Sequence, residues 1–132
     1  MSTSNPLGTL SAISLFVEDL GSTKTFYQAV FGVSVLFEDS TSVAVKFQNL
    51  IVNLLLASDA SALVSPAAVG GPESGKRFQI SIWVEDLDTV CKNLAKENVK
   101  LLTGPQIQPW GLKTVTFVDP AGHSWEIGQK VD

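Results

Sequence analysis

Two short segments of the chain share nearly the same pattern of apolar and polar positions. Residues 13–20 read Ile-Ser-Leu-Phe-Val-Glu-Asp-Leu, and residues 80–87 read Ile-Ser-Ile-Trp-Val-Glu-Asp-Leu, so that six of the eight positions are identical. Each run is short and dominated by β-branched and aromatic residues, which is typical of a β-strand. The chain therefore contains an internal repeat, and each copy is expected to begin with a strand.

A helical spacing of apolar residues follows each of these strands. In the first copy, we expect Ser22 to cap a helix that ends at Gly32 in a left-handed conformation. In the second copy, we expect Asp88 to cap a helix that ends near Asn98. The stripes predicted to be buried are Phe26, Tyr27 and Val30 in the first helix, and Val90, Cys91, Leu94 and Ala95 in the second.

Further strands are predicted after each helix. They are expected near residues 34–38, 43–47 and 51–56 in the first half, and near 100–104, 114–118 and 124–127 in the second. The sequence Asp119-Pro120-Ala121-Gly122 predicts a tight turn, because proline and glycine suit its two corners. Each half thus reads strand, helix and three strands, which predicts an α+β fold of two tandem βαβββ modules.

One domain of 132 residues is expected, with module boundaries set by composition. The first module covers about residues 10–57 and the second about 77–129. Residues 58–76, which are rich in alanine, serine, glycine and proline, are predicted to be a linker or a functional flap.

The composition excludes several classes of protein. A net charge of −4 argues against nucleic acid as a partner, and one cysteine excludes a disulfide within the chain. No apolar run approaches the roughly 20 residues of a membrane helix. The first six residues, Met-Ser-Thr-Ser-Asn-Pro, lack the basic and apolar regions of a signal peptide. We therefore expect a soluble, cytoplasmic protein with no membrane partner.

Strand alternation separates two faces in each copy of the repeat. The purely aliphatic faces, Ile13, Leu15 and Val17 in the first copy and Ile80, Ile82 and Val84 in the second, are predicted to meet the helices. The mixed faces are Ala12, Ser14 and Phe16 in the first copy and Gln79, Ser81 and Trp83 in the second. Apolar walls with a few polar groups are typical of a small-molecule pocket, so these faces are candidates for one.

Several of these features together indicate a known family. They are the two Val-Glu-Asp-Leu strand ends, the turn Pro109-Trp110-Gly111, and the sequence Asp-Pro-Ala-Gly-His-Ser-Trp-Glu-Ile at residues 119–127. In this order they resemble the vicinal oxygen chelate superfamily of glyoxalase I, extradiol dioxygenases and bleomycin resistance proteins, over about residues 10–129. The resemblance implies curved mixed sheets around a cavity and, in most small members, a homodimer with modules paired across the subunit boundary.

The resemblance also implies positions for a metal site. The metalloenzymes of this superfamily hold a divalent ion with four side chains, and the matching positions here are Ala12, Asn53, Gln79 and Glu126. Alanine has no ligand atom, and amide oxygens are weak donors compared with imidazole or carboxylate. We therefore expect no tightly bound metal; if a divalent ion (Zn, Ni, Mn or Fe) binds, Gln79 and Glu126 are its candidate ligands.

The expected function is binding without catalysis. Like the bleomycin resistance members, which confer antibiotic resistance, the protein is expected to sequester a drug-like or metabolite molecule, cationic and aromatic in character, in a pocket between its modules. The candidate ligand-binding residues are Ser14, Phe16, Asn53, Gln79, Ser81, Trp83, Trp110 and Glu126. The alternatives are a metal-dependent lyase, isomerase or dioxygenase using Gln79 and Glu126, and a metal-free enzyme with Glu126 as general base.

Three further residues have a structural interpretation. His123, the chain's one histidine, is expected to stabilise the turn in which it lies, and Trp125 is expected in the core. Cys91 lies on a helix stripe and is expected to be a small buried hydrophobe. For Trp110, closing the mouth of a pocket and simple packing are both open.

Overall fold

The computed structural model of the protein describes residues 6–131. Five of the six N-terminal residues that argue against a signal peptide lie outside this range. The contacts divide the chain into two compact units, one extending to Val69 and the other from Gly70 onward. Ala29–Phe31 group with the second unit. Each unit has its own four-stranded sheet.

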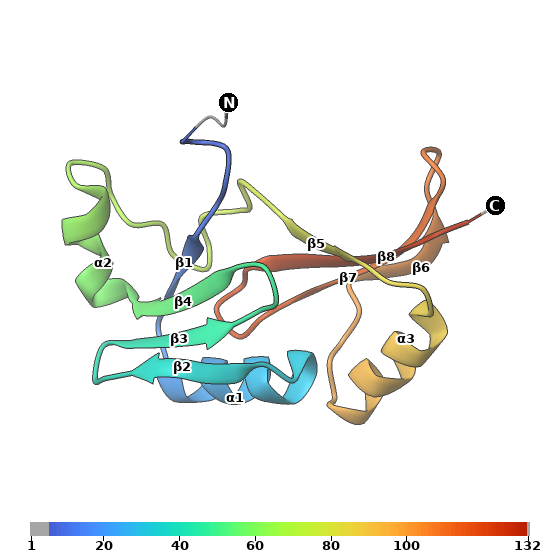
Figure 1. Ribbon diagram of the computed structural model, residues 1–132, viewed down its shortest axis with the longest axis horizontal. Coiled ribbons are helices and arrows are strands. Elements are labelled where there is room, and N and C mark those ends of the chain that lie inside the picture. Colours follow the sequence, from blue (N-terminus) through green and yellow to red (C-terminus); the bar gives the residue numbers. More distant parts are fainter. Residues whose placement is uncertain (1–5, 132) are drawn as a thin grey trace. The chain divides into compact units, whose positions relative to one another are not determined.

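The first unit contains one mixed four-stranded sheet (Figure 1). Its strands lie in the order β1-β4-β3-β2, with β1 parallel to β4 and the other pairs antiparallel. Its elements are β1 (Ala12–Val17), α1 (Leu20–Phe31), β2 (Ser34–Glu38), β3 (Ser42–Lys46), β4 (Ile51–Leu56) and α2 (Ala57–Val64).

One face of this sheet is buried. Leu15 and Val17 on β1 are almost fully buried, as are alternate residues on β3 and β4, namely Val43, Val45, Val52 and Leu54. The helix α1 contributes Thr23 and Tyr27, which lie four residues apart and therefore on one helix face, and both are buried. The predicted division of β1 into an aliphatic covered face and a mixed open face is confirmed.

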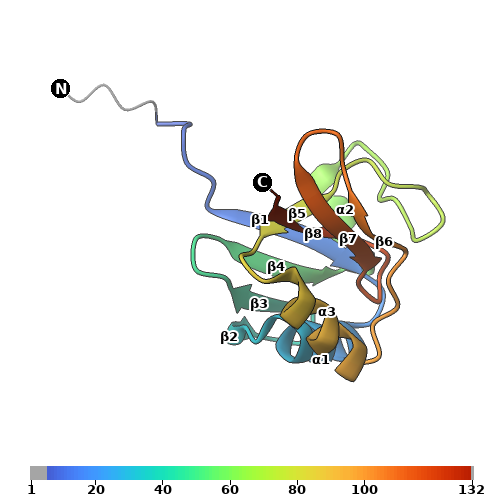
Figure 2. The ribbon, with the colours of Figure 1, turned by 90° about the vertical axis from the view of Figure 1, so that its right-hand side faces the viewer.

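The second unit repeats this architecture (Figure 2). Its strand order is β5-β8-β7-β6, again with one parallel pair, β5 and β8. Its elements are β5 (Ile80–Trp83), α3 (Leu87–Lys96), β6 (Thr103–Ile107), β7 (Leu112–Val118) and β8 (Ser124–Lys130). The α+β fold of two βαβββ modules is therefore confirmed, whereas the cavity and the pairing of modules in a dimer stay predictions.

Aromatic side chains fill the covered face of the second sheet. Trp125 is buried, as predicted, and its ring centroid lies 4.5 Å from that of Phe31. Phe117 is also buried, with its centroid 6.1 Å from Phe31. Leu87 and Leu94 bring the buried face of α3 into the core. Cys91 is half-buried rather than fully buried, and Ala95 is exposed.

The helix starts differ from the sequence predictions. Asp19, not Ser22, caps α1, because its carboxylate accepts a hydrogen bond of 3.0 Å from the backbone N–H of Ser22. Asp86, not Asp88, caps α3 and accepts from the N–H of Thr89 at 3.1 Å. Both helices therefore begin directly after the repeated Glu-Asp pair.

The two helices end as predicted, whereas the region between the modules contains a helix that was not predicted. Gly32 ends α1 in the left-handed conformation, and Asn98 adopts a positive φ just beyond α3, as expected. The segment predicted as a linker begins with the helix α2, whose Ala60 is buried. No helix among residues 6–131 is long and apolar enough to span a membrane.

Candidate functional site: the open face of the second sheet

Glu126 lies on the open face of the second sheet beside Ser81. The two residues are register partners on the parallel strands β8 and β5. The Ser81 hydroxyl donates a 3.0 Å hydrogen bond to Oε1 of Glu126, whose side chain is half-buried. This contact fixes one carboxylate oxygen, and a charge-assisted bond of this kind is stronger than one between neutral groups.

Hydroxyl and amide side chains continue this arrangement across the sheet. Gln79 Nε2 donates to Ser124 Oγ at 3.0 Å, and Gln108 Nε2 donates to Thr114 Oγ1 at 3.0 Å. The hydroxyls of Thr103 and Thr116 are 2.6 Å apart. Together with Ser81 and Glu126, these side chains form what we call the polar row: Gln79, Ser81, Thr103, Gln108, Thr114, Thr116, Ser124 and Glu126.

The sequence reasoning missed the β6 and β7 members of the polar row. Thr116 is the register partner of Glu126 on the other side of β8, and Thr103 is the partner of Thr116. Their signal in the sequence is the alternation of threonine with Val115 and Phe117 on β7. Alternation alone puts Thr114 and Thr116 on one face of β7. The register between the strands is also needed to align Thr116 and Thr103 with Glu126.

Trp83 lies on the same open face, at the level of Gly128. The two residues are register partners, and a Cβ at Gly128 would lie 3.5 Å from Cδ1 of the Trp83 indole. The same Cβ would lie 3.6 Å from side-chain carbons of Leu112 and Thr114. The missing side chain at Gly128 therefore leaves room for the indole against the sheet, and Trp83 is still 73% exposed.

The first sheet places its candidate residues on its own open face. Ser14 and Asn53 are register partners, as are Phe16 and Leu55. Ser14 is exposed, and Asn53 and Phe16 are half-buried. Asn53 thus occupies the position in the first sheet that Glu126 occupies in the second, and the first face carries an amide where the second carries a carboxylate.

Trp110 lies in the turn between β6 and β7 and is 66% exposed. The turn is closed by the N–H of Gly111, which donates to the carbonyl of Gln108 at 3.1 Å. The structure therefore places Trp110 between β6 and β7, two residues after Gln108 of the polar row.

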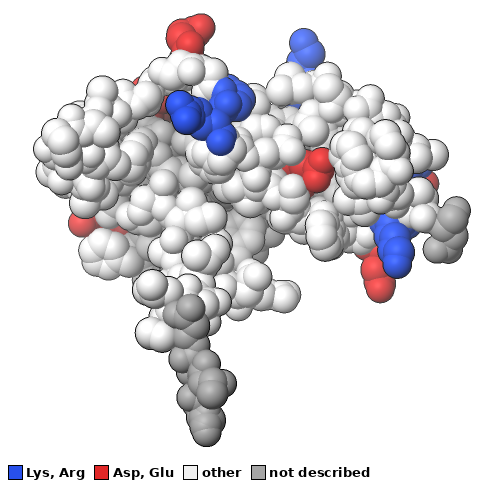
Figure 3. Space-filling model, turned by 90° about the horizontal axis from the view of Figure 1, so that it is seen from above, with Lys and Arg blue, Asp and Glu red and all other residues white. Residues whose placement is uncertain are grey.

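Uncharged residues contribute most of the surface on the face shown in Figure 3. Among the β5–β8 residues whose parity places them on the open face, Glu126 is the carboxylate and Lys130, at the end of β8, is the ammonium. Attraction of a cation to this face therefore depends on Glu126 itself.

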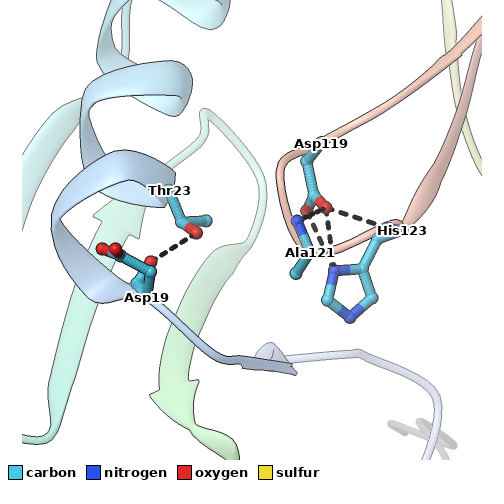
Figure 4. Close-up of polar contacts among 5 residues, drawn as sticks. All are labelled: Asp19, Thr23, Asp119, Ala121 and His123. Carbon is cyan, nitrogen blue, oxygen red and sulfur yellow. Dashed lines mark hydrogen bonds and ion pairs between the residues drawn. The ribbon is translucent and has the colours of Figure 1, made fainter. Parts of the chain in front are cut away.

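His123 is held in the β7–β8 turn by a buried carboxylate (Figure 4). Asp119 Oδ2 lies 2.9 Å from His123 Nδ1, and Asp119 Oδ1 accepts from the backbone N–H groups of Ala121 and His123, both at 2.9 Å. The Asp119 side chain is fully buried and that of His123 is 16% exposed. The prediction that His123 stabilises this turn agrees with these contacts.

The chain matches the model of a known protein family. The family model described as the Glyoxalase/Bleomycin resistance protein/Dioxygenase superfamily matches residues 9–127. The chain belongs to this superfamily. No curated protein matches the chain.

Solved structures of the superfamily share the fold. A glyoxalase/bleomycin resistance protein/dioxygenase from Nocardioides aligns with a TM-score of 0.84 at 19% identity, covering 99% of this chain and 87% of its own. A lactoylglutathione lyase from Agrobacterium tumefaciens aligns with a TM-score of 0.75 at 22% identity, covering 94% and 95%. A glyoxalase-related enzyme from Fulvimarina pelagi aligns at 0.80 with 20% identity, covering 94% and 89%. At these identities the likeness shows the fold alone.

The donor chemistry at the superfamily's metal positions does not fit a transition metal well. Ala12 offers no ligand atom, and Asn53 and Gln79 offer amide oxygens. Glu126 is the one carboxylate, and its Oε1 already accepts from Ser81. Within residues 6–131, no group of three or more histidine, cysteine, aspartate or glutamate side chains could hold a metal ion.

Proposed function

We propose that the protein binds a small organic molecule that carries a positive charge, and that the open face of its second sheet provides the contacts. The observation that carries this proposal is the Glu126 carboxylate, half-buried in the polar row and held by Ser81 at 3.0 Å. A carboxylate fixed among hydroxyl groups can form a charge-assisted hydrogen bond with an ammonium or amidinium group of a ligand.

Trp83 is proposed to provide the apolar contact beside this carboxylate. Its indole is exposed next to Gly128, so a flat ligand surface can lie against it. The remaining candidate binding residues are Gln79 in the polar row, Trp110 in the β6–β7 turn, and Ser14, Phe16 and Asn53 on the open face of the first sheet. The superfamily's bleomycin resistance members make binding without catalysis a reasonable role for this fold.

Glu126→Gln tests the proposal in a screen of cationic compounds followed by tryptophan fluorescence. Loss of the charge at nearly constant shape should weaken a cationic ligand by about 1–3 kcal/mol, or about 5- to 150-fold in Kd. Glu97→Gln, at the exposed end of α3, removes the same charge away from the open face and should leave Kd unchanged. Equal effects of both variants, or no effect of Glu126→Gln, would remove Glu126 from the site.

A metal-dependent lyase, isomerase or dioxygenase is the second candidate function. The observation that favours it is that Gln79 and Glu126 lie on one face, each hydrogen-bonded to a serine hydroxyl. Elemental analysis of tag-free protein after incubation with Mn, Fe, Ni and Zn salts distinguishes the two functions. Near-stoichiometric metal that disappears in Glu126→Ala would favour the enzyme over the binding protein.

We further propose that the protein is a cytoplasmic homodimer in which modules pair between chains. Analytical ultracentrifugation gives its mass directly. If modules are exchanged, truncation after Val69, which keeps α2 and its buried Ala60 with the first module, should abolish folding, because the isolated module would lack its partner. A stable monomeric half would contradict the exchange.

A further inference from the structure

We propose that the ligand of the second sheet is an amine-bearing, hydroxyl-rich ring compound of the amino sugar or aminocyclitol class. This inference rests on the proposed function, because it names the ligand class of the same face. It uses three features of that face together: the polar row, the exposed indole of Trp83 and the single carboxylate of Glu126.

The polar row matches a ligand with many hydroxyl groups. A serine or threonine hydroxyl has one donor and two acceptor sites, and an amide side chain has both kinds of site. Thr114 is only 1% exposed and offers nothing to a ligand, but the other members of the polar row are exposed or half-buried. Their hydrogen bonds to one another use part of this capacity, so they still offer donors and acceptors along the face. Ligand hydroxyls also donate and accept, so they can satisfy both the donors and the acceptors of the row. A purely aromatic ligand would displace the water bound to these groups and offer no hydrogen bond in its place.

Trp83 provides a flat apolar surface at the edge of the row. Gly128 removes the side chain that would otherwise stand at the register position of Trp83, and Thr114 and Leu112 lie around the same spot. A saturated ring has one face made mainly of C–H groups, which can cover an exposed indole while the ring's hydroxyls reach sideways. The indole and the polar row therefore suit the two kinds of surface that such a ring presents.

Glu126 selects an amine within this class. Ser81 donates to its Oε1, and a carboxylate accepts about four hydrogen bonds, so acceptor sites are left for a ligand. An ammonium in place of a ring hydroxyl gains a charge-assisted bond to this carboxylate. A neutral sugar of the same shape lacks that term.

Isothermal titration with three probes tests the inference. The probes are the β-1,4 disaccharide of glucosamine, cellobiose as its uncharged counterpart, and a phenanthridinium dye as a planar aromatic cation. We expect the glucosamine disaccharide to bind at least tenfold more tightly than cellobiose. Glu126→Gln should abolish that difference, and Trp83→Ala should weaken both sugars about fivefold or more.

Two control variants and the probe set keep the outcomes distinct. Glu97→Gln and Leu63→Ala remove an exposed charge and an exposed apolar side chain outside the second sheet, and neither should change these affinities. If only the dye binds, in a Glu126-dependent way, the inferred class is wrong while cation binding stands. Equal binding of the two disaccharides, or no binding of either, also overturns the inference; circular dichroism confirms that each variant is folded.

Discussion

The two sheets of this protein have the same strand order, and their parallel strand pairs have the same register, but their open faces differ. Ser14 and Asn53 pair in the first sheet where Ser81 and Glu126 pair in the second. One position further along the same face, the first sheet has Leu55 where the second has Gly128. The repeat thus preserves the architecture while the chemistry of the open face differs, which leaves the second module with the carboxylate and the accessible indole.

The covered faces show why the architecture is preserved. Leu54 and Ile127 occupy matching positions, opposite Leu15 and Ile82 respectively, and both are nearly fully buried. Close packing makes such positions sensitive to a change of even one methylene group. The exposed and half-buried positions of the open faces have no such constraint, so substitutions there can alter binding chemistry without loss of the fold.

The largest expected effect tests whether the two cores are equivalent. Leu54→Ala and Ile127→Ala should each lower the free energy of unfolding by about 2–5 kcal/mol, through lost burial and the cavity left behind. Urea denaturation followed by circular dichroism measures both. A cost below about 1 kcal/mol in one module alone would contradict the equivalence of the two cores, because that module's core would then contribute little to the stability of the protein.

Gly104 on β6 should give the next largest effect. Its φ is 89°, and a Cβ built there would overlap the backbone of Thr114 on the neighbouring strand. Gly104→Ala should therefore cost about 1–3 kcal/mol or more in the same denaturation experiment. The outer strand of the first sheet, β2, has its own register shift at Leu36, which is 55% exposed, and Leu36→Ala should change stability by no more than about 0.5 kcal/mol. Similar costs for the two variants would contradict this contrast.

Gly128→Ala should have a smaller effect of the opposite sign. The new Cβ would make ordinary contacts of 3.5–3.6 Å and the backbone is extended, so the substitution should stabilise the protein by about 0.4–1 kcal/mol. Gly128→Leu, which copies Leu55 of the first sheet, should instead displace the indole of Trp83. The NMR signal of the Trp83 indole N–H should move strongly in Gly128→Leu and little in Gly128→Ala; equal shifts would contradict the role given to Gly128.

The smallest expected effect is the pH dependence of the cap that Asp86 forms at the start of α3. The Thr89 hydroxyl donates to Asp86 at 2.7 Å, and this bond, with that of the Thr89 N–H, holds the pKa of Asp86 below its ordinary value of 3.8. Because the folded pKa is lowered, the stability from this cap is present above about pH 4, the unfolded value, and is lost as the pH falls through the folded pKa. An NMR titration of the Asp86 carboxyl should give a midpoint below 3.8, and Thr89→Ala should raise it.

The caps also show what the sequence can and cannot predict. The order of strands and helices follows from the repeat and from alternation, so the fold and the two faces of β1 were predicted correctly. The cap positions were not, because Asp19 and Ser22 can both cap a helix and pattern alone does not choose between them. The structure shows Asp19 accepting from Ser22 while Thr23 donates to the Asp19 carbonyl at 2.7 Å (Figure 4).

Only part of the candidate site could be predicted, because alternation acts within one strand whereas the site combines several strands. Parity placed Gln79, Ser81 and Trp83 on one face, since a strand alternates with a fixed period of two, and the resemblance to the superfamily added Glu126. Thr103 and Thr116 could not be added without the register of β6, which begins three residues later than predicted and is shifted near Gly104. The room for the Trp83 indole against the sheet depends on Gly128, a partner 45 residues away that no local pattern identifies.

The irregular outer strands have a consequence for how the protein behaves at high concentration. β2 and β6 each form one of the two edges of their sheet, and each has a register shift, at Leu36 in β2 and between Thr103 and Gln106 in β6, whereas β1 and β5 at the opposite edges pair without one. A regular edge strand offers a continuous ladder of N–H and C=O groups on which another chain can template a strand. Pro105 removes one N–H from the β6 ladder, and the two shifts interrupt the geometry that a growing fibril would need to copy.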